Sequence, residues 1–251
     1  MKTFITTAVI VLLSISVNAQ GLKGLLNKTV KKDSTGKSLL DKIPSSSKSG
    51  GGLSNDDIVS GLKEALRVGT DSSSKKLGGV DGYFADAAVK ILMPDEAKKV
   101  ESTLRSVGMG KVVDKAVLSM NRAAEDAANG IGDIFWTAIK NMTVTDGLKI
   151  LQGGDFAETE YLQKTTTVVL TEKFRPVIDA SLTKVDATKY WKDVFSTYNK
   201  FSSSQVNTDL TAYVTEKALK GLFYQISLQE QKIRKDPAAQ VTDILKKVFG
   251  K

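Results

Sequence analysis

The fold class depends on Asp155–Thr183, which reads DFAETEYLQKTTTVVLTEKFRPVIDASLT and holds the strand-like segment of the chain. That segment is the run Thr165–Leu170, TTTVVL, and β-branched residues of this kind are enriched in strands. Both flanks of the run read as helix, from the start signal Asp155-Phe-Ala-Glu158 to about Thr183, with Pro176 predicting a kink. We therefore place the run inside one long helix and predict an all-α protein.

Helix start signals and apolar stripes repeat along the rest of the chain. Ser54-Asn-Asp-Asp57 and Thr143-Val-Thr-Asp146 place a hydroxyl three residues before a carboxylate, which is the spacing of a capping box. An apolar stripe with helical spacing ends at Asn129-Gly130 and consists of Val113, Ala116, Val117, Met120, Ala124 and Ala127. Further helices are expected over Phe84–Ile91, from Pro94 to near Gly108, from Asp186, from Asn207-Thr-Asp209 and from Asp236-Pro237, the last with Val241, Ile244, Leu245 and Val248 facing inward. The pattern predicts a single domain of about nine helices.

Residues 1–19 are typical of a secretory signal peptide. Lys2 gives a positive start, Phe4–Val17 is an apolar run of 14 residues, and Val17-Asn-Ala19 fits a cleavage site before Gln20. A bilayer-spanning helix needs about 20 residues, so an uncleaved anchor is the weaker interpretation. No cysteine follows the site, and no other stretch is as long and apolar as a membrane helix. We expect a soluble protein exported to the periplasm or beyond, and not a lipoprotein.

Residues 20–52 are predicted to form a flexible basic tail before the domain at 53–250. The tail includes Ser45–Gly52, SSSKSGGG, a Ser/Gly linker, and seven lysines against two aspartates give it a net charge of +5. Lysines also alternate with Leu22, Leu25, Leu26 and Val30, whose spacing allows a short amphipathic helix. A solvated, disordered tail is the favoured interpretation, while weak peripheral membrane contact or docking onto the chain's own domain are the alternatives.

The charge distribution argues against nucleic acid as a partner. The whole chain carries +8, of which the tail and Lys2 supply +6, so residues 53–251 carry only +2. A nucleic-acid-binding domain usually presents a basic face with interleaved aromatics or a recognisable motif. Aromatic residues make up only 7% of the chain. No nucleic-acid binding is expected.

The absence of histidine and cysteine excludes several kinds of site. Zinc fingers, iron–sulfur centres and histidine-ligated metals lack their ligands, and the Ser-His-Asp and Cys-His catalytic sets lack a base or a nucleophile. Disulfides are also excluded, so an exported chain must be stabilised by its packed core alone. We predict no catalytic residues, no metal site and no cofactor.

Several of the capped segments resemble one known family. Leu53–Gly69, LSNDDIVSGLKEALRVG, is similar to the opening of the bacterial DUF4197 family, a family of unknown function. Further blocks that resemble it follow in order: Met120–Glu125, Met142–Gly154, Tyr213–Phe223, Ile233–Ala239 and Leu245–Gly250. The resemblance covers Leu53 to Gly250. It implies a helical, usually exported bacterial protein, and it brings no activity and no catalytic residues with it.

Four residues are candidates for ligand binding. Asn121 and Arg122 follow the inward-facing Met120, which places both at the edge of the apolar stripe. A guanidinium there can bind an anionic group at a pocket rim, although an ion pair with Glu125 or Asp126 is the simpler expectation. Trp136 and Tyr161 belong to a set of aromatics that can line an apolar cavity between helices, the others being Trp191, Tyr198 and Phe223. Core packing is the simpler expectation for this set.

Other motifs are better explained by structure than by chemistry. Ser-x-x-Lys occurs at Ser60–Lys63 and Ser181–Lys184, but the companion Ser-Asp-Asn and Lys-Thr-Gly elements of penicillin-binding enzymes are absent. The acidic pair Glu125-Asp126 lies beside the apolar stripe, so we expect it on a solvated face rather than around a metal ion.

The sequence therefore favours a non-enzymatic, extracytoplasmic helical binding protein. Its partner is expected to be another protein or a hydrophobic small molecule, with the tail as a tether or spacer. The alternative is a hydrolase that acts on envelope material with carboxylates or lysine. A water-accessible cleft holding two carboxylates within about 10 Å would favour that alternative.

Overall fold

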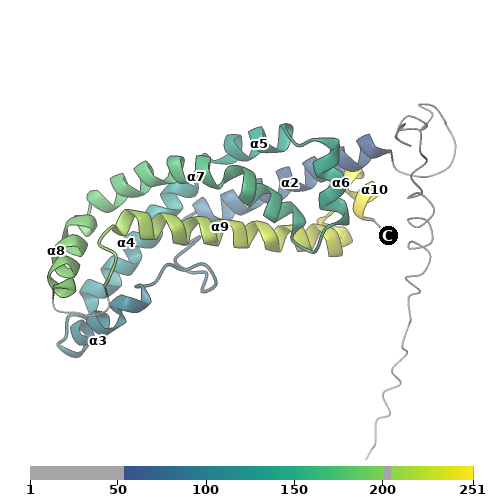
Figure 1. Cartoon of the computed structure of the whole chain (residues 1–251). Helices are drawn as coiled ribbons and strands as arrows, with labels where there is room; N and C mark the ends of the chain where they lie inside the picture. The colour runs from purple at the N-terminus through teal and green to yellow at the C-terminus, as the bar shows by residue number, and fades with distance from the viewer. Residues whose placement is uncertain (1–53, 201–204, 251) are drawn as a thin grey trace, which may run out of the picture. The chain divides into compact units, whose positions relative to one another are not determined.

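The structure is a computed structural model that describes residues 54–200 and 205–250. All regular secondary structure in these two ranges is helical (Figure 1), which confirms the all-α prediction. The described α-helices are α2 (Asn55–Gly78), α3 (Lys98–Ser106), α4 (Gly110–Ala128), α5 (Gly132–Lys140), α6 (Val144–Gln152), α7 (Ala157–Thr183), α8 (Ala187–Asn199), α9 (Leu210–Lys235) and α10 (Asp243–Phe249). Short 3-10 helices, η2 (Asp95–Ala97) and η3 (Pro237–Ala239), precede α3 and α10. The predicted signal peptide and basic tail lie outside the described residues.

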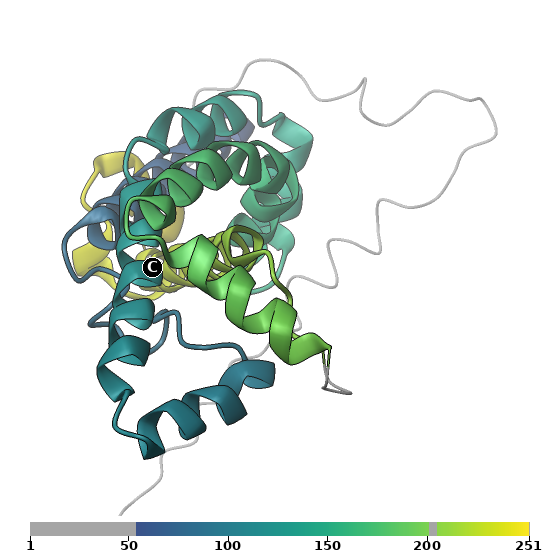
Figure 2. The same cartoon turned by 90° about the vertical axis from the view of Figure 1, so that its left-hand side faces the viewer.

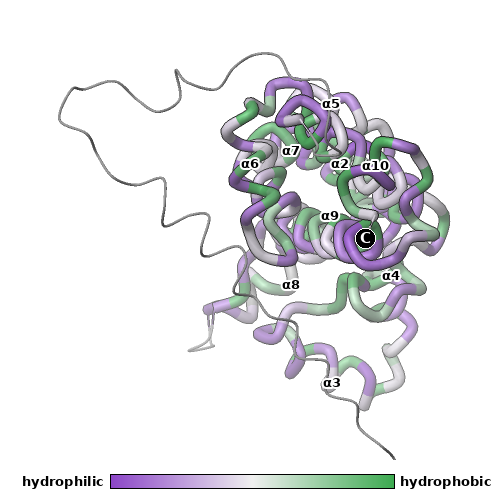
Figure 3. The backbone as a smooth tube through the Cα atoms, turned by 90° about the vertical axis from the view of Figure 1, so that its right-hand side faces the viewer, coloured by the Kyte–Doolittle hydropathy of each residue, from purple (hydrophilic) through white to green (hydrophobic). Residues whose placement is uncertain are grey.

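The four long helices α2, α4, α7 and α9 build the centre of the fold. Helix α7 lies against both α9 and α4, and α2 lies against α9, α4 and the shorter helices α5, α6 and α10. Helices α3 and α8 lie at one end of the long helices, and α6 and α10 lie at the other (Figure 1). Figure 3 views the bundle from the end that carries α6 and α10. In the part of the chain that the structure describes, no helix is both long and apolar enough to cross a membrane.

The strand-like run Thr165–Leu170 is part of α7, as predicted. The buried residues of this helix recur at every fourth position, namely Leu162, Thr166, Leu170, Phe174, Ile178 and Leu182. Val168 and Val169 fall off this stripe and are exposed. The threonine hydroxyls donate to the carbonyl four residues earlier, as Thr166 Oγ1 does to Leu162 O at 2.6 Å. This local bonding and the buried stripe explain why the run is helical despite its β-branched composition.

The two predicted capping boxes are present. Ser54 Oγ accepts from the backbone N–H of Asp57 at 3.1 Å, and the Asp57 carboxylate accepts from the backbone N–H of Ser54 at 3.2 Å. Thr143 and Asp146 make the same pair of bonds at the start of α6. The hydrogen bonds from Ser54 hold the pKa of Asp57 below its usual value. Both helices therefore begin where the sequence pattern places them.

The predicted helix over Phe84–Ile91 is wrong, because residues 79–94 form turns and extended backbone. Two buried side chains of α4 bind backbone groups of this segment. Glu125 Oε1 accepts from the N–H groups of Tyr83 and Phe84, both at 3.1 Å. Asn121 accepts from the N–H of Ile91 and donates to its carbonyl, both at 2.8 Å. Side chains of α4 thus hydrogen-bond the backbone of this loop, so these backbone groups are satisfied although they are buried.

The C-terminal region also differs from the prediction. Asp236-Pro237 begins the 3-10 helix η3, and α10 begins only at Asp243, where the Thr242 side chain caps it. Val241, which the sequence pattern predicts to face inward, is 65% exposed, because it lies in the connection between the two helices. Leu245 is fully buried, as predicted.

Candidate functional site

Asn121 is fully buried rather than at the edge of the apolar stripe. Besides its two bonds to Ile91, its amide donates to the carbonyl of Val117 at 2.7 Å. These bonds engage the amide's carbonyl oxygen and its nitrogen, and they fix the loop 79–94 against α4. The structure thus gives Asn121 a clear role in holding the loop.

Arg122 bridges two carboxylates, one of which the sequence predicted. Its Nη1 lies 2.5 Å from Glu125 Oε2, and its Nη2 lies 2.7 Å from Asp81 Oδ1 in the loop. Glu125 itself is 4% exposed, so the expected solvated position of this carboxylate is wrong. The loop covers Glu125, and the bonds from Tyr83 and Phe84 compensate its burial.

Trp136 and Tyr161 lie on neighbouring helices, α5 and α7. Trp136 is 40% exposed, and the Nζ of Lys140 lies 5.6 Å from its ring centroid. Tyr161 donates from its hydroxyl to the carbonyl of Ala138 at 3.3 Å and lines a surface hollow of about 450 Å³ between α5 and α7. Trp136, Asn121 and Arg122 are not among the lining residues of that hollow. The four residues do not meet in one cavity, and their role in ligand binding stays a prediction.

An apolar cavity of about 270 Å³ lies between α3, α4 and α8. Its wall is built almost entirely from aliphatic, methionine and aromatic side chains: Met93, Val100, Leu104, Val112, Val113, Ala116, Met120, Val185, Ala187, Tyr190, Trp191, Phe195 and Leu210. Lys115 and Ser119 are the other lining residues and supply polar groups. Figure 2 faces the end of the bundle at which these three helices lie. An apolar wall with a few polar groups is the usual make-up of a small-molecule site.

The α8 wall of the cavity is held by its own aromatic cluster. The rings of Trp191 and Phe195 have centroids 4.4 Å apart, and Trp191 Nε1 donates to the carbonyl of Asn207 at 2.9 Å. The Asn199 side chain accepts from the N–H of Val206 at 2.8 Å and donates to its carbonyl at 2.7 Å. These bonds tie both ends of the connection from α8 to α9, so the wall keeps its place although α8 has few other neighbours.

The opposite wall is held by an ion pair across α3 and α4. Arg105 Nε lies 2.9 Å from Glu101 Oε1, and Arg105 Nη2 lies 2.9 Å from Asp114 Oδ1 on α4. No side chain of α3 is fully buried, since this helix covers only one flank of α4. The apolar side chains Val100 and Leu104 of α3 face the cavity, and the charged side chains lie outside.

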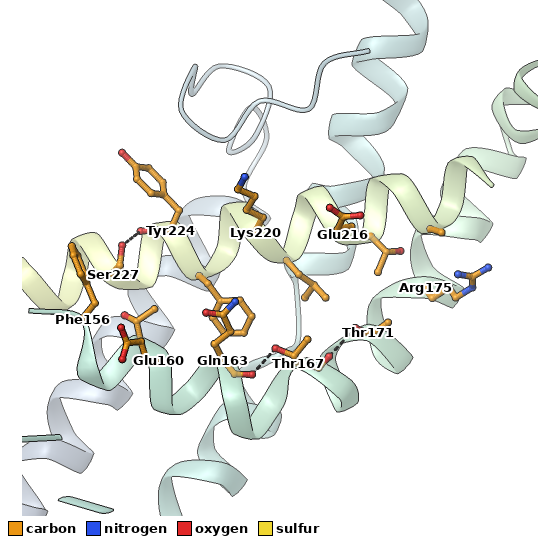
Figure 4. A pocket seen from close by; sticks show the side chains of 15 residues that line it. Phe156, Glu160, Gln163, Thr167, Thr171, Arg175, Glu216, Lys220, Tyr224 and Ser227 are labelled. Atoms are coloured by element: carbon orange, nitrogen blue, oxygen red, sulfur yellow. Dashed lines mark hydrogen bonds between the residues drawn. The ribbon is translucent and has the colours of Figure 1, made fainter. Parts of the chain in front are cut away.

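A second and more polar depression runs between α7 and α9, with a volume of about 700 Å³ (Figure 4). Its sides carry several threonines, together with Glu160, Gln163, Lys220 and Glu216. The hydroxyls of Thr167 and Thr171 donate to carbonyls of their own helix, at 2.5 and 2.8 Å (Figure 4). Because these hydroxyl protons are already donated within α7, the two threonines offer the groove only their methyl groups and hydroxyl lone pairs.

The two accessible carboxylates of this groove lie far apart. Helices α7 and α9 are antiparallel, because Glu230 bonds to Thr159 and Thr211 bonds to Asp179. Glu216 is therefore opposite about residue 174 of α7, and at about 1.5 Å per residue it lies roughly 20 Å along the groove from Glu160. Figure 4 shows the two side chains toward opposite ends of the groove. Acid–base hydrolysis of a glycosidic bond needs two carboxyl groups within about 10 Å.

A pair of carboxylates that does lie close together is buried beneath the groove. Arg234 Nη2 lies 3.1 Å from Glu230 Oε1 and 3.4 Å from Glu158 Oε1. Burial, reinforced by the charge of Glu230, raises the pKa of Glu158 to about 8, although Arg234 opposes the rise. Glu158 and Glu230 are 2% and 3% exposed, so a substrate has no access to them. The cluster joins α7 to α9.

The remaining motifs have structural partners. Lys63 Nζ donates to the carbonyl of Lys140 at 2.9 Å, and Ser181 Oγ donates to Asp126 Oδ2 at 2.8 Å. Neither Ser-x-x-Lys pair is joined by a hydrogen bond within itself. Over residues 54–200 and 205–250, no group of three or more acidic side chains is arranged to hold a metal ion.

The described part of the chain is thus an all-helical domain with an apolar cavity at one end. A family model described as "Protein of unknown function (DUF4197)" matches residues 52–250, and the chain belongs to that family. This finding confirms the resemblance that the sequence blocks indicated. Comparison with curated proteins and with solved structures gave no match.

Sequence reasoning named one residue of the cavity, Trp191, within its set of interhelical aromatics. It missed the opposite wall, because Val100 and Leu104 read as the ordinary apolar face of the short helix α3 and Val112 falls outside the apolar stripe of α4. The signal in the sequence was an apolar residue outside the stripe of α4, Val112, which the structure shows to be 52% exposed.

Proposed function

We propose that this protein binds an apolar ligand in the cavity between α3, α4 and α8. The observation that carries the proposal is the composition of the wall, in which 13 of 15 lining residues are aliphatic, methionine or aromatic. The cavity volume of about 270 Å³ is close to the lower end of the usual range for ligand pockets, roughly 300–1,000 Å³. A single hydrocarbon chain or a small ring system fits this size better than a large ligand.

The polar groups of the cavity suit one end of such a ligand. Lys115 and Ser119 are one helical turn apart on α4, and Lys115 forms no ion pair with any described residue. An ammonium group at the opening can bind an acidic or hydrogen-bonding head while the apolar part occupies the interior.

The groove between α7 and α9 gives less support to the hydrolase alternative. Its carboxylates are roughly 20 Å apart by helix geometry, and the close pair, Glu158 and Glu230, is buried. We also propose that the chain acts outside the cytoplasm, on the strength of the signal-like residues 1–19. Detection of mature chain beginning at Gln20 in the periplasm or medium would test that location.

The test of the ligand is native mass spectrometry of the chain from Gln20 to Lys251, produced with export, before and after organic extraction. A reproducible extra mass that extracts with solvent is expected, and a bare monomer mass would count against a resident ligand. Titration with the apolar dye N-phenyl-1-naphthylamine then locates the site. Ala116→Phe, which fills the cavity, is expected to weaken dye binding at least tenfold.

Thr167→Phe is the matched control, because it adds the same ring to the α7–α9 groove instead. It is expected to leave dye affinity unchanged, and thermal unfolding of both variants checks that they remain folded. Equal affinities in the parent and in Ala116→Phe would overturn the assignment of the site.

A further inference from the structure

The opening of the cavity between α3, α4 and α8 exposes apolar side chains to solvent. Val112, Val185 and Tyr190 line the cavity and are nevertheless 52%, 53% and 61% exposed. Met109, three residues before Val112 and at the N-cap of α4, is 47% exposed. Scattered surface apolar residues are normal, but a group around one opening marks an interaction surface.

Lysines without partners accompany these apolar residues. Lys111 and Lys115 flank Val112 on α4, and Lys184 and Lys189 flank Val185 and Tyr190 before and within α8. None of the four forms an ion pair with another described residue, and all are exposed. Other basic groups nearby are engaged, since Arg105 binds Glu101 and Asp114, and Lys98 binds Asp95.

Few acidic groups offset these lysines. In residues 109–116, the carboxylate is Asp114, which Arg105 neutralises at 2.9 Å. In residues 184–190, the carboxylate is Asp186, between Lys184 and Lys189. The two segments together thus carry an excess of positive charge next to exposed apolar side chains, which is the combination that binds anionic lipid surfaces.

We propose that this mouth surface, formed by Met109, Val112, Val185 and Tyr190 with Lys111, Lys115, Lys184 and Lys189, docks onto an anionic lipid bilayer. The apolar side chains enter the interface between headgroups and acyl chains, where a tyrosine ring is also well placed because its hydroxyl can stay hydrated. The lysines bind the lipid phosphates. Docking in this orientation turns the cavity opening toward the acyl chains, so an apolar ligand can enter without crossing water.

This inference goes beyond the proposed ligand binding and can fail separately from it. The experiment is co-sedimentation of the chain from Gln20 to Lys251 with vesicles of phosphatidylcholine alone or of phosphatidylcholine with 30% phosphatidylglycerol. We expect binding to the anionic vesicles at 0.1 M salt, at least tenfold weaker binding at 0.5 M salt because of screening, and little binding to the neutral vesicles. Absence of binding to the anionic vesicles would overturn the proposal.

Paired variants locate the docking surface. Val112→Asp with Val185→Asp is expected to weaken binding at least tenfold, since both side chains are at the mouth. The matched control is Val168→Asp with Val169→Asp on α7, two exposed valines outside the mouth surface, which should bind as the parent does. Equal binding by the mouth variant and the parent would refute the surface.

A corresponding pair tests the charges. Lys115→Gln with Lys184→Gln should lower affinity for anionic vesicles and reduce its salt dependence. Lys173→Gln with Lys220→Gln removes the same charge from exposed lysines of α7 and α9 and should have a much smaller effect. The basic tail is present in all of these chains, so the differences between them report on the mouth surface alone.

A fluorescence experiment shows which surface touches the bilayer even if the basic tail supplies most of the affinity for vesicles. Tyr190→Trp places an additional indole at the mouth, and the fluorescence that it adds to that of the native Trp136 and Trp191 should be quenched by vesicles containing phosphatidylglycerol with brominated acyl chains. Val168→Trp is the control, and the fluorescence that it adds to that of the parent chain should not be quenched. Absence of quenching at position 190, with the chain bound to the vesicles, would show that the chain binds by another surface and would overturn the proposal. Dye binding by Ala116→Phe, measured separately, reports on the cavity and not on docking.

Discussion

Glu230, in the last part of α9, caps the first turn of α7 by accepting from the backbone N–H of Glu158 at 3.0 Å and of Thr159 at 2.9 Å. Thr159 Oγ1 also donates to Glu230, at 2.7 Å, and Arg234 donates from the same helix. A carboxylate at a helix N-terminus is favoured by the free N–H groups and by the helix dipole. Residues more than 70 positions apart in the sequence thus join α7 to α9.

The first prediction concerns the pH dependence of stability. Burial raises the pKa of Glu158 to about 8, above its value of 4.5 in an unfolded chain. The native state therefore keeps a proton that the unfolded state loses, so the free energy of unfolding should fall as pH rises from about 4.5 to 8, by at most about 1.4 kcal/mol per pH unit. Glu158→Gln, which mimics the protonated form, should flatten this slope. Urea unfolding of parent and variant at pH 5, 6.5 and 8 measures it, and identical slopes would contradict the prediction.

The second prediction concerns the cap itself. Glu230→Ala leaves the N–H groups of Glu158 and Thr159 and the guanidinium of Arg234 without this acceptor in a buried site. Removing one member of a buried charged network typically costs about 3–5 kcal/mol, and we expect a loss in that range. Chemical denaturation measures the loss. Glu216→Ala, on the exposed side of the same helix, should change stability by less than about 0.5 kcal/mol and serves as the control.

The third prediction tests the attachment of the loop 79–94. Asn121→Ala removes both bonds to Ile91 and should cost about 2–3 kcal/mol, since the backbone N–H and carbonyl stay buried without partners. Hydrogen exchange of amides in this loop should accelerate more than that of amides in α9. Asn141→Ala at an exposed position should do neither. Unchanged exchange in the loop of Asn121→Ala would show that other contacts hold it.

The fourth prediction concerns the close approach of the same loop to α9. A Cβ at Gly221 would lie 2.9 Å from Cε1 of Tyr83 and 3.1 Å from Cβ of Val89, so Gly221→Ala must displace the loop. Overpacking of this kind costs about 1–3 kcal/mol, and the melting temperature should fall accordingly. A Cβ at Gly154 meets nothing within 4 Å, so Gly154→Ala should leave the melting temperature nearly unchanged. Similar behaviour of the two variants would be the contrary result.

Local signals in the sequence located most helices well. The capping boxes at Ser54 and Thr143 begin α2 and α6, and Asp209 caps α9 with a 2.8 Å bond to the N–H of Ala212. The signals failed over Phe84–Ile91, where the chain has helical composition but its backbone groups bind side chains of α4. Such a failure is expected wherever distant side chains replace local hydrogen bonds, because a periodicity pattern contains no information about them.

The candidate sites were harder to predict than the helices. Asn121 and Arg122 are polar residues beside an apolar stripe, a pattern that indicates a binding site, whereas the structure uses them to hold the loop 79–94. The cavity depends on side chains from three helices, and single-helix patterns cannot distinguish a residue that fills the core from one that lines an opening. Val112 and Val113 are adjacent valines in the sequence, but in the folded chain Val112 is 52% exposed and Val113 is 1% exposed.

The sequence by itself determined the helical class, most helix boundaries and the family, because caps, stripes and recurrent blocks are local properties that need no partner. Only the tertiary structure decided which polar residues are buried, that Glu230 caps α7, and where an apolar cavity opens. The physical reason is that burial and hydrogen-bond partners are set by residues far away in the chain: Glu125 reads as a surface residue until the loop from Tyr83 to Ile91 covers it.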